Sequence, residues 1–518
     1  MSSVLRVYRN LTPTEKTILC ETATGVKNGV LFSATYYKNF PNKDLSDNET
    51  LRSDMNQRLS DSMIWKALLK VIKEHAELRC AVSRNLEFEP VDKIDFEDVV
   101  RKIEFDCYAD EQVNCYNGVP PYLLRHIFDK CHFTLGQKQP LWQLFVIDGT
   151  MVVFHGHDVL FDTFAAANFH KLFLQALNSL SESCTSPRPV FKGGKILPTL
   201  PRALFQKQEP QAASSITDAF YSQSQAILRS LYNLAIKKPL RFIESGRIEH
   251  STEQHSGTPE PLNYPNHLCG TVVFGTISTP RFKILKGILN DHKISMKTFI
   301  ISATLFCLQP VLDSSEDKIT FSLPINLRDL IPWSSPLGIY HRNVLIECPL
   351  GTAGRNSNCS AGSYVSNPEL LEGMTLSDAN QTNADQADPE SLFERTVTHV
   401  SNELKKALQD LETGKFKDMD MMKMEQEAKF YAAASGSKII EINDLSEIDL
   451  SNVNPSQYVV EDICATKSRC NNTFMSISYS FSSTCGLNLG IHYSEDCEMN
   501  YFVESFEAFL ENYPKFVC

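Results

Sequence analysis

Residues 141–177 place the tightest limit on the fold of this chain. Two apolar runs, at 141–147 and 151–157, flank Asp148-Gly149, a turn pair typical of a two-residue β-hairpin. The apolar side chains that follow recur at helical spacing instead: they are Phe169, Leu172, Phe173, Ala176 and Leu177. A strand that leads directly into an amphipathic helix buries both apolar surfaces when the helix packs on the sheet. The segment therefore predicts a mixed α/β fold.

The remainder of the 518 residues divides into parts of different composition. Residues 1–180 hold the hairpin and form the expected N-terminal half. Residues 181–265 are rich in Ser, Pro, Gln and Gly, which predicts a linker or crossover with one amphipathic helix embedded around 219–236. Residues 266–518 alternate strand and helix patterns again. They form the expected second half, which is interrupted by a polar insertion at 351–389.

The charge balance and the cysteines argue against several classes of protein. The chain has 62 acidic and 50 basic residues and a formal net charge of −12, whereas an extended nucleic-acid surface needs a basic excess. Its 15 cysteines are scattered without a Cys-x-x-Cys pair, which favours buried thiols in an intracellular protein over a disulfide framework or zinc site. No apolar run reaches the length of about 18 residues that spans a membrane. We expect a cytoplasmic protein that binds neither nucleic acid nor metal.

The end of the second apolar run carries the residue types best suited to catalysis. The sequence there is His155-Gly156-His157-Asp158, and Asp162 follows at the start of the helical pattern. Histidine is the side chain most able to accept a proton near neutral pH, and rigid scaffolds place catalytic groups where strands end. Each residue also has a purely structural interpretation: the histidines as packed side chains, and Asp162 as the N-cap of the helix.

This stretch resembles a known signature, the His-His-x-x-x-Asp-Gly motif of the chloramphenicol-acetyltransferase-like superfamily, which includes condensation domains. More narrowly, the chain is similar to the fungal alcohol acetyltransferase family. Four further matches occur in the expected order: Thr12-Pro13-Thr14-Glu15, the helix end at 75–79, Pro140-Leu141-Trp142-Gln143-Leu144 and Pro324-Ile325-Asn326-Leu327-Arg328. The resemblance covers nearly the whole chain.

The resemblance implies an α/β (α+β) fold of two lobes, each a mixed sheet with helices, and an active-site tunnel between them. It implies acetyl-CoA as co-substrate, no metal, and a histidine that deprotonates the acceptor hydroxyl or amine. In relatives the aspartate of the motif is mainly structural and pairs with an arginine of the second lobe. By position these two residues are Asp162 and Arg328.

The chain departs from the motif at the catalytic position. When the motif is aligned on Asp162 without a gap, His157 matches the first histidine, Asp158 replaces the second, catalytic one, and Thr163 replaces the glycine. With one extra residue in the turn, His157 itself is the base. The sequence leaves both alignments open. In the first, Asp158 needs a pKa raised by desolvation to act as a base, or the site is weak or inactive.

We therefore expect an acetyltransferase that acts on the amine or hydroxyl of a small or amphipathic acceptor, with detoxifying N-acetylation of a sphingosine-like amine favoured. The alternatives are an alcohol O-acetyltransferase that forms acetate esters, and a non-catalytic binding or regulatory protein with a degenerate motif. We expect a monomer. The basic, amphipathic segment around 219–236 suggests peripheral contact with a membrane, and relatives are found at the endoplasmic reticulum or lipid droplets.

Overall fold

The structure is a computed structural model of the 518-residue chain. The part that it describes comprises residues 8–23, 29–38, 58–104, 119, 121–133, 135–180, 191–192, 200–201, 271–308, 312, 318–349, 389–412, 439–446, 448, 450, 458–467, 473–482, 486–493 and 499–517. Apart from residues 191–192, 200–201 and 389, the expected linker at 181–265, with its helix, and the insertion at 351–389 lie outside this part.

The chain divides into two compact units, and neither is continuous in sequence. Unit 1 comprises Met1–Cys269, Asn326–His341 and Glu447–Arg469. Unit 2 comprises Gly270–Ile325, Arg342–Ser446 and Cys470–Cys518. From the sequence the whole of 266–518 is expected in one half, but two of its segments, Asn326–His341 and Glu447–Arg469, belong to unit 1. One of them, at 447–469, supplies a strand to the unit 1 sheet, which a sequence pattern does not reveal because strand pairing is non-local.

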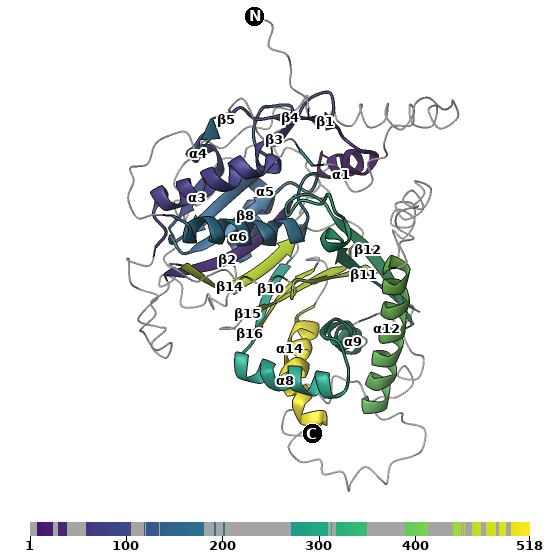
Figure 1. The fold of residues 1–518 in the computed structure, drawn as a ribbon. Helices are drawn as coiled ribbons and strands as arrows, with labels where there is room; N and C mark the ends of the chain where they lie inside the picture. The colour runs from purple at the N-terminus through teal and green to yellow at the C-terminus, as the bar shows by residue number, and fades with distance from the viewer. Residues whose placement is uncertain are drawn as a thin grey trace, which may run out of the picture. The chain divides into compact units, whose positions relative to one another are not determined.

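Unit 1 is built on a five-stranded mixed sheet. From one edge to the other its strands are β14 (Tyr458–Lys467), β2 (Val30–Lys38), β8 (Met151–Gly156), β7 (Trp142–Ile147) and β6 (Val100–Ile103) (Figure 1). The pairs β14–β2, β2–β8 and β7–β8 are antiparallel, and β6–β7 is parallel. The β7–β8 hairpin turns at Asp148 and Gly149, whose φ angles are 50° and 70°. Both values are positive, as expected for an Asp-Gly pair in a two-residue hairpin turn.

Helices α3 (Asp61–Glu74) and α6 (Thr163–Asn178) pack against each other and against one face of this sheet (Figure 1). Trp142, Phe154 and Phe169 fill the interface between the sheet and α6: Phe154 and Phe169 stack with ring centroids 4.4 Å apart. Because strand side chains alternate, His155 points to the opposite face, where its ring contacts Phe128 and Phe133. The alternation of β8 thus sends the histidine away from the helical layer.

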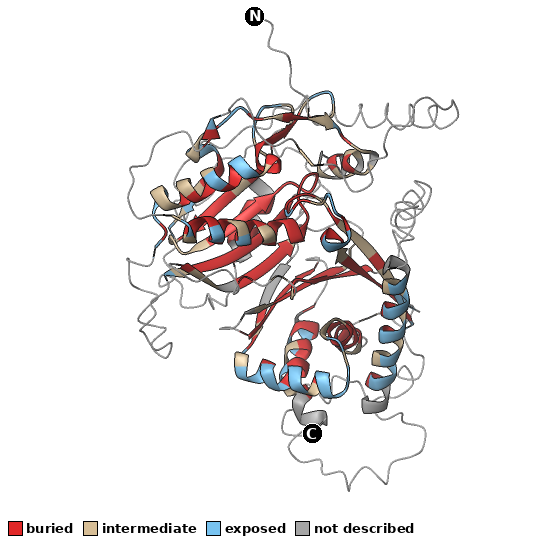
Figure 2. Ribbon diagram, viewed as in Figure 1, coloured by how far each residue is buried: buried red, intermediate tan, exposed pale blue. Residues whose placement is uncertain are grey.

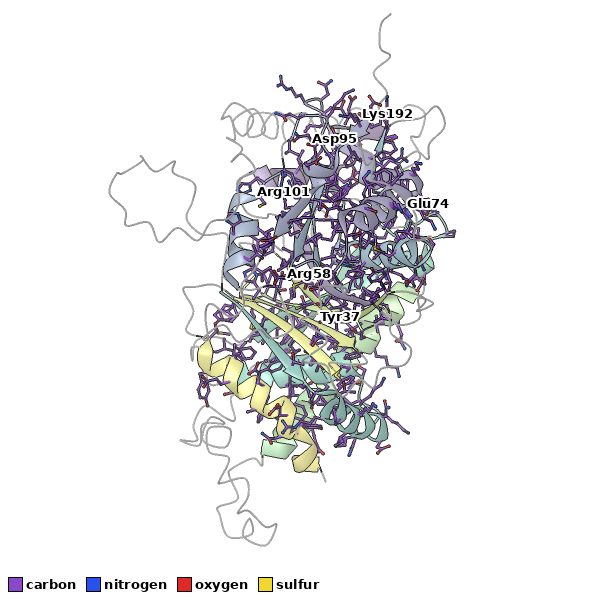
Figure 3. All side chains as sticks on the ribbon, turned by 90° about the vertical axis from the view of Figure 1, so that its left-hand side faces the viewer. Tyr37, Arg58, Glu74, Asp95, Arg101 and Lys192 are labelled. Carbon is purple, nitrogen blue, oxygen red and sulfur yellow. The ribbon has the colours of Figure 1, made fainter. Side chains whose placement is uncertain are left out.

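Smaller elements complete unit 1. A three-stranded sheet is formed by β1 (Arg9–Asn10), β4 (Glu87–Pro90) and β3 (Cys80–Val82). A two-stranded ribbon, marked by Asp95 and Lys192 in Figure 3, is formed by β5 (Lys93–Ile94) and β9 (Phe191–Lys192). The described helical segments that remain are α1 (Pro13–Ala23), η3 (Ala76–Arg79), α4 (Phe96–Val99), α5 (Pro121–Lys130) and η5 (Arg328–Leu330).

The expected start of α1 is confirmed by its hydrogen bonds. The backbone N–H of Thr12 donates to Oε2 of Glu15 at 2.7 Å, and the N–H of Glu15 donates to the Thr12 hydroxyl at 3.3 Å. These reciprocal bonds form a capping box, which satisfies two backbone donors at the helix start.

Unit 2 is built on a six-stranded mixed sheet in the order β10 (Thr271–Ile277), β16 (Gly486–Tyr493), β15 (Met475–Ser482), β13 (Ile439–Asp444), β11 (Lys318–Asn326) and β12 (His341–Pro349). Its helices are α8 (Thr279–Asp291), α9 (Met296–Leu308), α12 (Pro389–Glu412) and α14 (Asn500–Val517). They gather on one side of the sheet (Figure 1). Among the helices that are described, none has the length and apolar character needed to cross a membrane.

A buried histidine ties α6 to β2 in unit 1. The Tyr36 hydroxyl lies 2.8 Å from Nδ1 of His170, and Nε2 of His170 lies 3.0 Å from the backbone oxygen of Phe32. These distances fit a neutral imidazole that donates from Nε2 and accepts at Nδ1. Burial lowers the pKa of His170 to about 4, because desolvation disfavours the charged ring. Folding therefore requires this histidine to be neutral.

We predict that His170 makes unit 1 less stable in mild acid. An unfolded histidine has a pKa of about 6.5, so between that pH and about 4 the unfolded state binds one more proton, and stability falls by about 1.4 kcal/mol per pH unit from this residue. The variant His170→Gln should remove that part of the slope. All three tryptophans of the chain lie in unit 1, so urea unfolding followed by tryptophan fluorescence measures it. An unchanged slope in the variant would contradict the assignment.

Candidate functional site

The candidate site lies in the turn between β8 and α6. The backbone N–H of His157 donates to the oxygen of Leu141 at 2.9 Å, which extends the pairing of β8 with β7 by one residue. The N–H groups of Leu160 and Phe161 then both donate to the oxygen of His157 at 3.0 Å. These bonds close a tight turn, which holds His157 and Asp158 between a sheet strand and a helix start. The four residues that the sequence analysis singled out meet here or directly beside it.

Asp162 begins α6 and makes the densest set of polar contacts in the site. Its Oδ1 accepts from the backbone N–H of Ala165 at 2.7 Å, as an N-cap does. Arg328 donates from Nη2 to Oδ1 at 2.8 Å and from Nη1 to Oδ2 at 3.2 Å. The N–H of Tyr340 and the ring of His341 reach Oδ2 at 2.9 Å and 3.3 Å. The structure thus brings together Asp162 and Arg328, the pair that the resemblance implies.

The charge of Asp162 is stabilised although the side chain is buried. Burial alone would raise the pKa of this carboxyl, but Arg328 and His341 together hold the pKa well below its ordinary value. Arg328 is held in turn by the backbone oxygens of Ser335, Pro336 and Gly338. A carboxylate whose lone pairs are all engaged is a poor base, so Asp162 fixes the start of α6 and does not take protons.

His157 is a buried ring with one occupied nitrogen. The backbone N–H of Val159 donates to its Nδ1 at 3.0 Å, so the proton of the neutral ring is on Nε2. Nε2 has no hydrogen-bond partner among the residues that the structure describes. Burial, with a smaller contribution from His155, lowers the pKa of His157 to about 3. At neutral pH the ring therefore offers an N–H donor at Nε2 and no lone pair there for a proton.

Asp158 is the more accessible of the two candidate bases. Its side chain is 7% exposed, compared with 1% for His157 and 0% for His155. Its Oδ2 accepts from the backbone N–H of Gly29 at 2.7 Å. One carboxylate oxygen is thus held by the chain segment that begins β2.

Gly29, which the sequence analysis did not single out, is required for this contact. Its φ is +92°, and a Cβ built there would come within 2.6 Å of the Gly156 backbone oxygen and 2.7 Å of His155 Nε2. Any larger residue would separate β2 from the end of β8 and move the N–H away from Asp158. A Gly before an apolar strand is the signal in the sequence, but it becomes specific only when the pairing of β2 with β8 is known. The sequence does not point to Tyr340 and His341 either, because only the folded chain brings these distant residues into contact with Asp162.

His155 packs among aromatic rings. Its ring centroid lies 4.7 Å from that of Phe133, and Phe128 and Phe145 contact it at 6.2 Å and 6.4 Å. Phe133 also contacts His157, at 5.6 Å. The two histidines therefore share one aromatic wall. No group of three side chains suited to metal binding occurs in the described ranges.

Comparison with known proteins agrees with this architecture. The family model for alcohol acetyltransferases matches residues 34–336, more than half of the chain and a range that contains the turn, Asp162 and Arg328. The chain is also 35% identical to "PSTB2-interacting protein 1" of Saccharomyces cerevisiae, over 98% of this chain and 100% of that protein. The chain belongs to the alcohol acetyltransferase family. As a member of that family it is an acyltransferase, and the family supports acetyl transfer as its activity.

Solved structures share the fold of this alcohol acetyltransferase family member at low identity. The trichothecene 15-O-acetyltransferase TRI3 from Fusarium sporotrichioides has a TM-score of 0.56 and 12% identity, over 97% of this chain and 95% of that chain. The first condensation domain of the CDA synthetase has a TM-score of 0.54 and 12% identity, over 99% and 97%. The mixed α/β fold expected from the sequence is confirmed, and TRI3 and the condensation domain share it.

We predict that the Asp162–Arg328 pair behaves as one unit in unfolding experiments. Both side chains are at most 7% exposed, so Arg328→Met leaves a buried charge and should cost about 3–5 kcal/mol of stability. The double variant Asp162→Asn with Arg328→Met should be more stable than the sum of the single losses predicts. A double-mutant cycle followed by tryptophan fluorescence measures the coupling.

The exposed pair between Lys102 and Asp61 in the same unit is the matched control. Its side chains are 54% and 51% exposed, so Lys102→Met should cost less than about 1 kcal/mol. Additive losses at Asp162 and Arg328 would show that the two residues do not depend on each other.

Proposed function

We propose that the protein transfers the acetyl group of acetyl-CoA to the amine of a small or amphipathic acceptor, with Asp158 as the base. The observation that carries the proposal is the division of roles in the turn. His157 offers only a donor at Nε2, whereas Asp158 offers a carboxylate held by Gly29. The gapless alignment of the motif, with Asp158 at the catalytic position, agrees with this chemistry. The tunnel that the resemblance implies stays a prediction.

The reaction needs one proton transfer that suits a carboxylate. The neutral amine nitrogen attacks the thioester carbonyl, and the new C–N bond leaves a tetrahedral intermediate with a positive nitrogen. That nitrogen is strongly acidic, so Asp158 can accept its proton. The C–S bond then breaks, and the CoA thiolate leaves and takes the proton from Asp158. The products are an N-acetylated amine and free CoA.

An alcohol makes a stronger demand on the base. A hydroxyl is too weakly acidic to attack without losing its proton in the same step, and base catalysis is most effective when the pKa of the base lies near the working pH. A carboxylate has an ordinary pKa of about 4, far below neutrality, whereas that of histidine is about 6.5. The replacement of histidine by Asp158 therefore favours amine acceptors over ester formation.

His157 supplies the second group that acetyl transfer requires. The carbonyl oxygen of the thioester gains negative charge as the amine adds, and a fixed N–H donor in a site without water stabilises that charge. The Nε2–H of His157 is such a donor, because the bond from Val159 fixes its tautomer and burial keeps the ring neutral. We assign to His157 the role of donor to the oxyanion.

Several finer expectations are part of this proposal. They are a sphingosine-like amine as the acceptor, a role in detoxification, a monomeric state, and a cytoplasmic location with peripheral contact at the endoplasmic reticulum or lipid droplets. The segment expected to touch the membrane, around 219–236, lies outside the described residues. Flotation of the purified protein with anionic vesicles would test that contact directly.

The yeast relative suggests a second function beside catalysis. Its name states an interaction with PSTB2, and its whole length aligns with 98% of this chain at 35% identity. We therefore propose that this protein also binds a PSTB2-like partner. Co-purification of the two proteins should survive Asp158→Asn, because binding of a partner does not need the base.

We predict that Asp158→Asn abolishes acetyl transfer to amines. Loss of a general base typically costs about 10²- to 10⁴-fold in rate, and asparagine preserves the size and the contact with Gly29. Release of free CoA thiol, measured with acetyl-CoA and a series of long-chain amines, gives the rate. The matched control is Asp92→Asn, at a side chain 77% exposed. Equal rates for parent and Asp158→Asn would remove Asp158 from the mechanism.

We also predict a graded response at His157. His157→Gln retains a side-chain N–H donor, whereas His157→Leu has none, so kcat should fall more in the leucine variant, by roughly 10²- to 10³-fold. The Michaelis constant for the amine should change little, because the lost bond forms to the reacting carbonyl. Kinetics of the two variants under the same assay separate this role from a packing role, in which leucine would be tolerated at least as well as glutamine.

A further inference from the structure

The unit 2 sheet has one apolar and one polar face. The apolar face packs against helices, as sheet faces usually do. Its side chains belong to a single hydrophobic core with helices α8, α9, α12 and α14. On strands β13, β15 and β16 this face comprises Ile440, Ile442, Ile477, Tyr479, Leu487, Leu489 and Ile491. The opposite face of the same strands therefore does not pack against these helices.

The polar face carries hydrogen-bonding side chains on neighbouring strands, at the positions that point away from the helices. The strand register places Ser322 beside Glu441, Glu441 beside Ser476, Asn443 beside Ser478, and Ser476 beside His492. All are at most 8% exposed, and Figure 2 shows most of strands β11, β13, β15 and β16 as buried. A sheet face that only packs on protein is normally apolar, because burying polar groups costs free energy. A continuous buried polar face indicates a binding surface.

Asn443 lies on this face, on β13 beside Ser478, and one end of its carboxamide is unpartnered. Nδ2 donates to the hydroxyls of Ser476 at 3.2 Å and Ser478 at 3.3 Å. Oδ1 has no hydrogen-bond partner among the described residues, and the residue is 1% exposed. A buried acceptor without a partner lowers the stability of the fold, and a ligand donor would recover that loss. Each serine hydroxyl, having accepted from Nδ2, retains its own hydrogen to donate.

This cluster therefore presents one acceptor and two donors side by side. A secondary amide is the complementary group, since its N–H can donate to Oδ1 of Asn443 and its C=O can accept from a serine hydroxyl. Gly490 stands opposite Ser478 in the register and carries no side chain on this face.

We propose that Asn443, Ser476 and Ser478 form a binding site for a secondary amide of the substrates or products. The inference deepens the proposed function, because acetyl-CoA carries two secondary amides in its pantetheine arm and N-acetylation creates another in the product. The shared chemistry is the amide. Its source, the donor arm or the acetylated acceptor, is decided by the experiment below.

The experiment measures binding without turnover, by titration calorimetry of the full chain. The probes are pantetheine, N-acetyloctylamine and octyl acetate, the last of which matches N-acetyloctylamine in shape but lacks the N–H. The variants are Asn443→Leu, which is close in size but has no polar atoms, and Ser478→Ala, which removes one hydroxyl. Asn290→Leu, at an exposed position of α8, is the control.

We expect Asn443→Leu to weaken binding of one of the amides about tenfold, and Ser478→Ala to weaken it about three- to fivefold, as loss of one or two neutral hydrogen bonds implies. Loss with pantetheine identifies the donor arm, and loss with N-acetyloctylamine identifies the product. Octyl acetate and Asn290→Leu should show no such change.

The proposal is overturned if the parent binds neither amide, if both variants bind the amides as tightly as the parent, or if octyl acetate loses affinity by the same factor. Because no acetyl transfer is measured, the result is separate from the proposed function. If the parent protein transfers no acetyl group but Asn443→Leu weakens amide binding, this inference is supported and the proposed function is wrong.

Discussion

The buried ion pair between Asp162 and Arg328 is the interaction on which the site depends. It joins the N-cap residue of α6 to a segment more than 160 positions later in the chain, and both belong to unit 1. Because Asp162 also caps α6 and accepts from Tyr340, moving it would displace the helix, the turn and the later segment together. The turn that carries His157 and Asp158 begins where β8 pairs with β7 and ends at the Asp162–Arg328 ion pair. Its geometry is therefore held from both sides.

Hydrogen bonds from backbone N–H groups fix the side chains of His157 and Asp158 in this turn. The N–H of Val159 takes the lone pair of His157 Nδ1, and the N–H of Gly29 holds Asp158. The first bond leaves His157 with a donor at Nε2, and in our proposal the second holds the carboxylate that acts as the base. In our proposal this carboxylate favours amine acceptors, because an amine loses its proton after it attacks, whereas a hydroxyl has to lose its proton as it attacks.

The sequence predicted what depends on local pattern and on ordered motifs. The β7–β8 hairpin follows from alternating apolar runs around Asp148-Gly149, and the contact between Asp162 and Arg328 follows from the resemblance. What depends on pairing between distant segments could not be predicted: the entry of β14 into the unit 1 sheet, the approach of Gly29 to Asp158, and the reach of His341 to Asp162. The choice between His157 and Asp158 as the proposed base also stayed open in the sequence, because it depends on hydrogen bonds made in the turn. In unit 2, Asn443 and Ser478 become one cluster only in the register of β13 with β15.

The most direct test of the account restores the histidine that the motif calls for. Asp158→His should shift acceptor preference, and the measurement is a competition in which one long-chain amine and the alcohol of the same chain length share limiting acetyl-CoA. The account predicts that the parent forms the amide almost alone and that the variant gains ester relative to amide by at least about tenfold, since a histidine base suits a hydroxyl. A parent that forms mainly ester, or a variant with an unchanged product ratio, would contradict the claim that the carboxylate of Asp158 selects the amine.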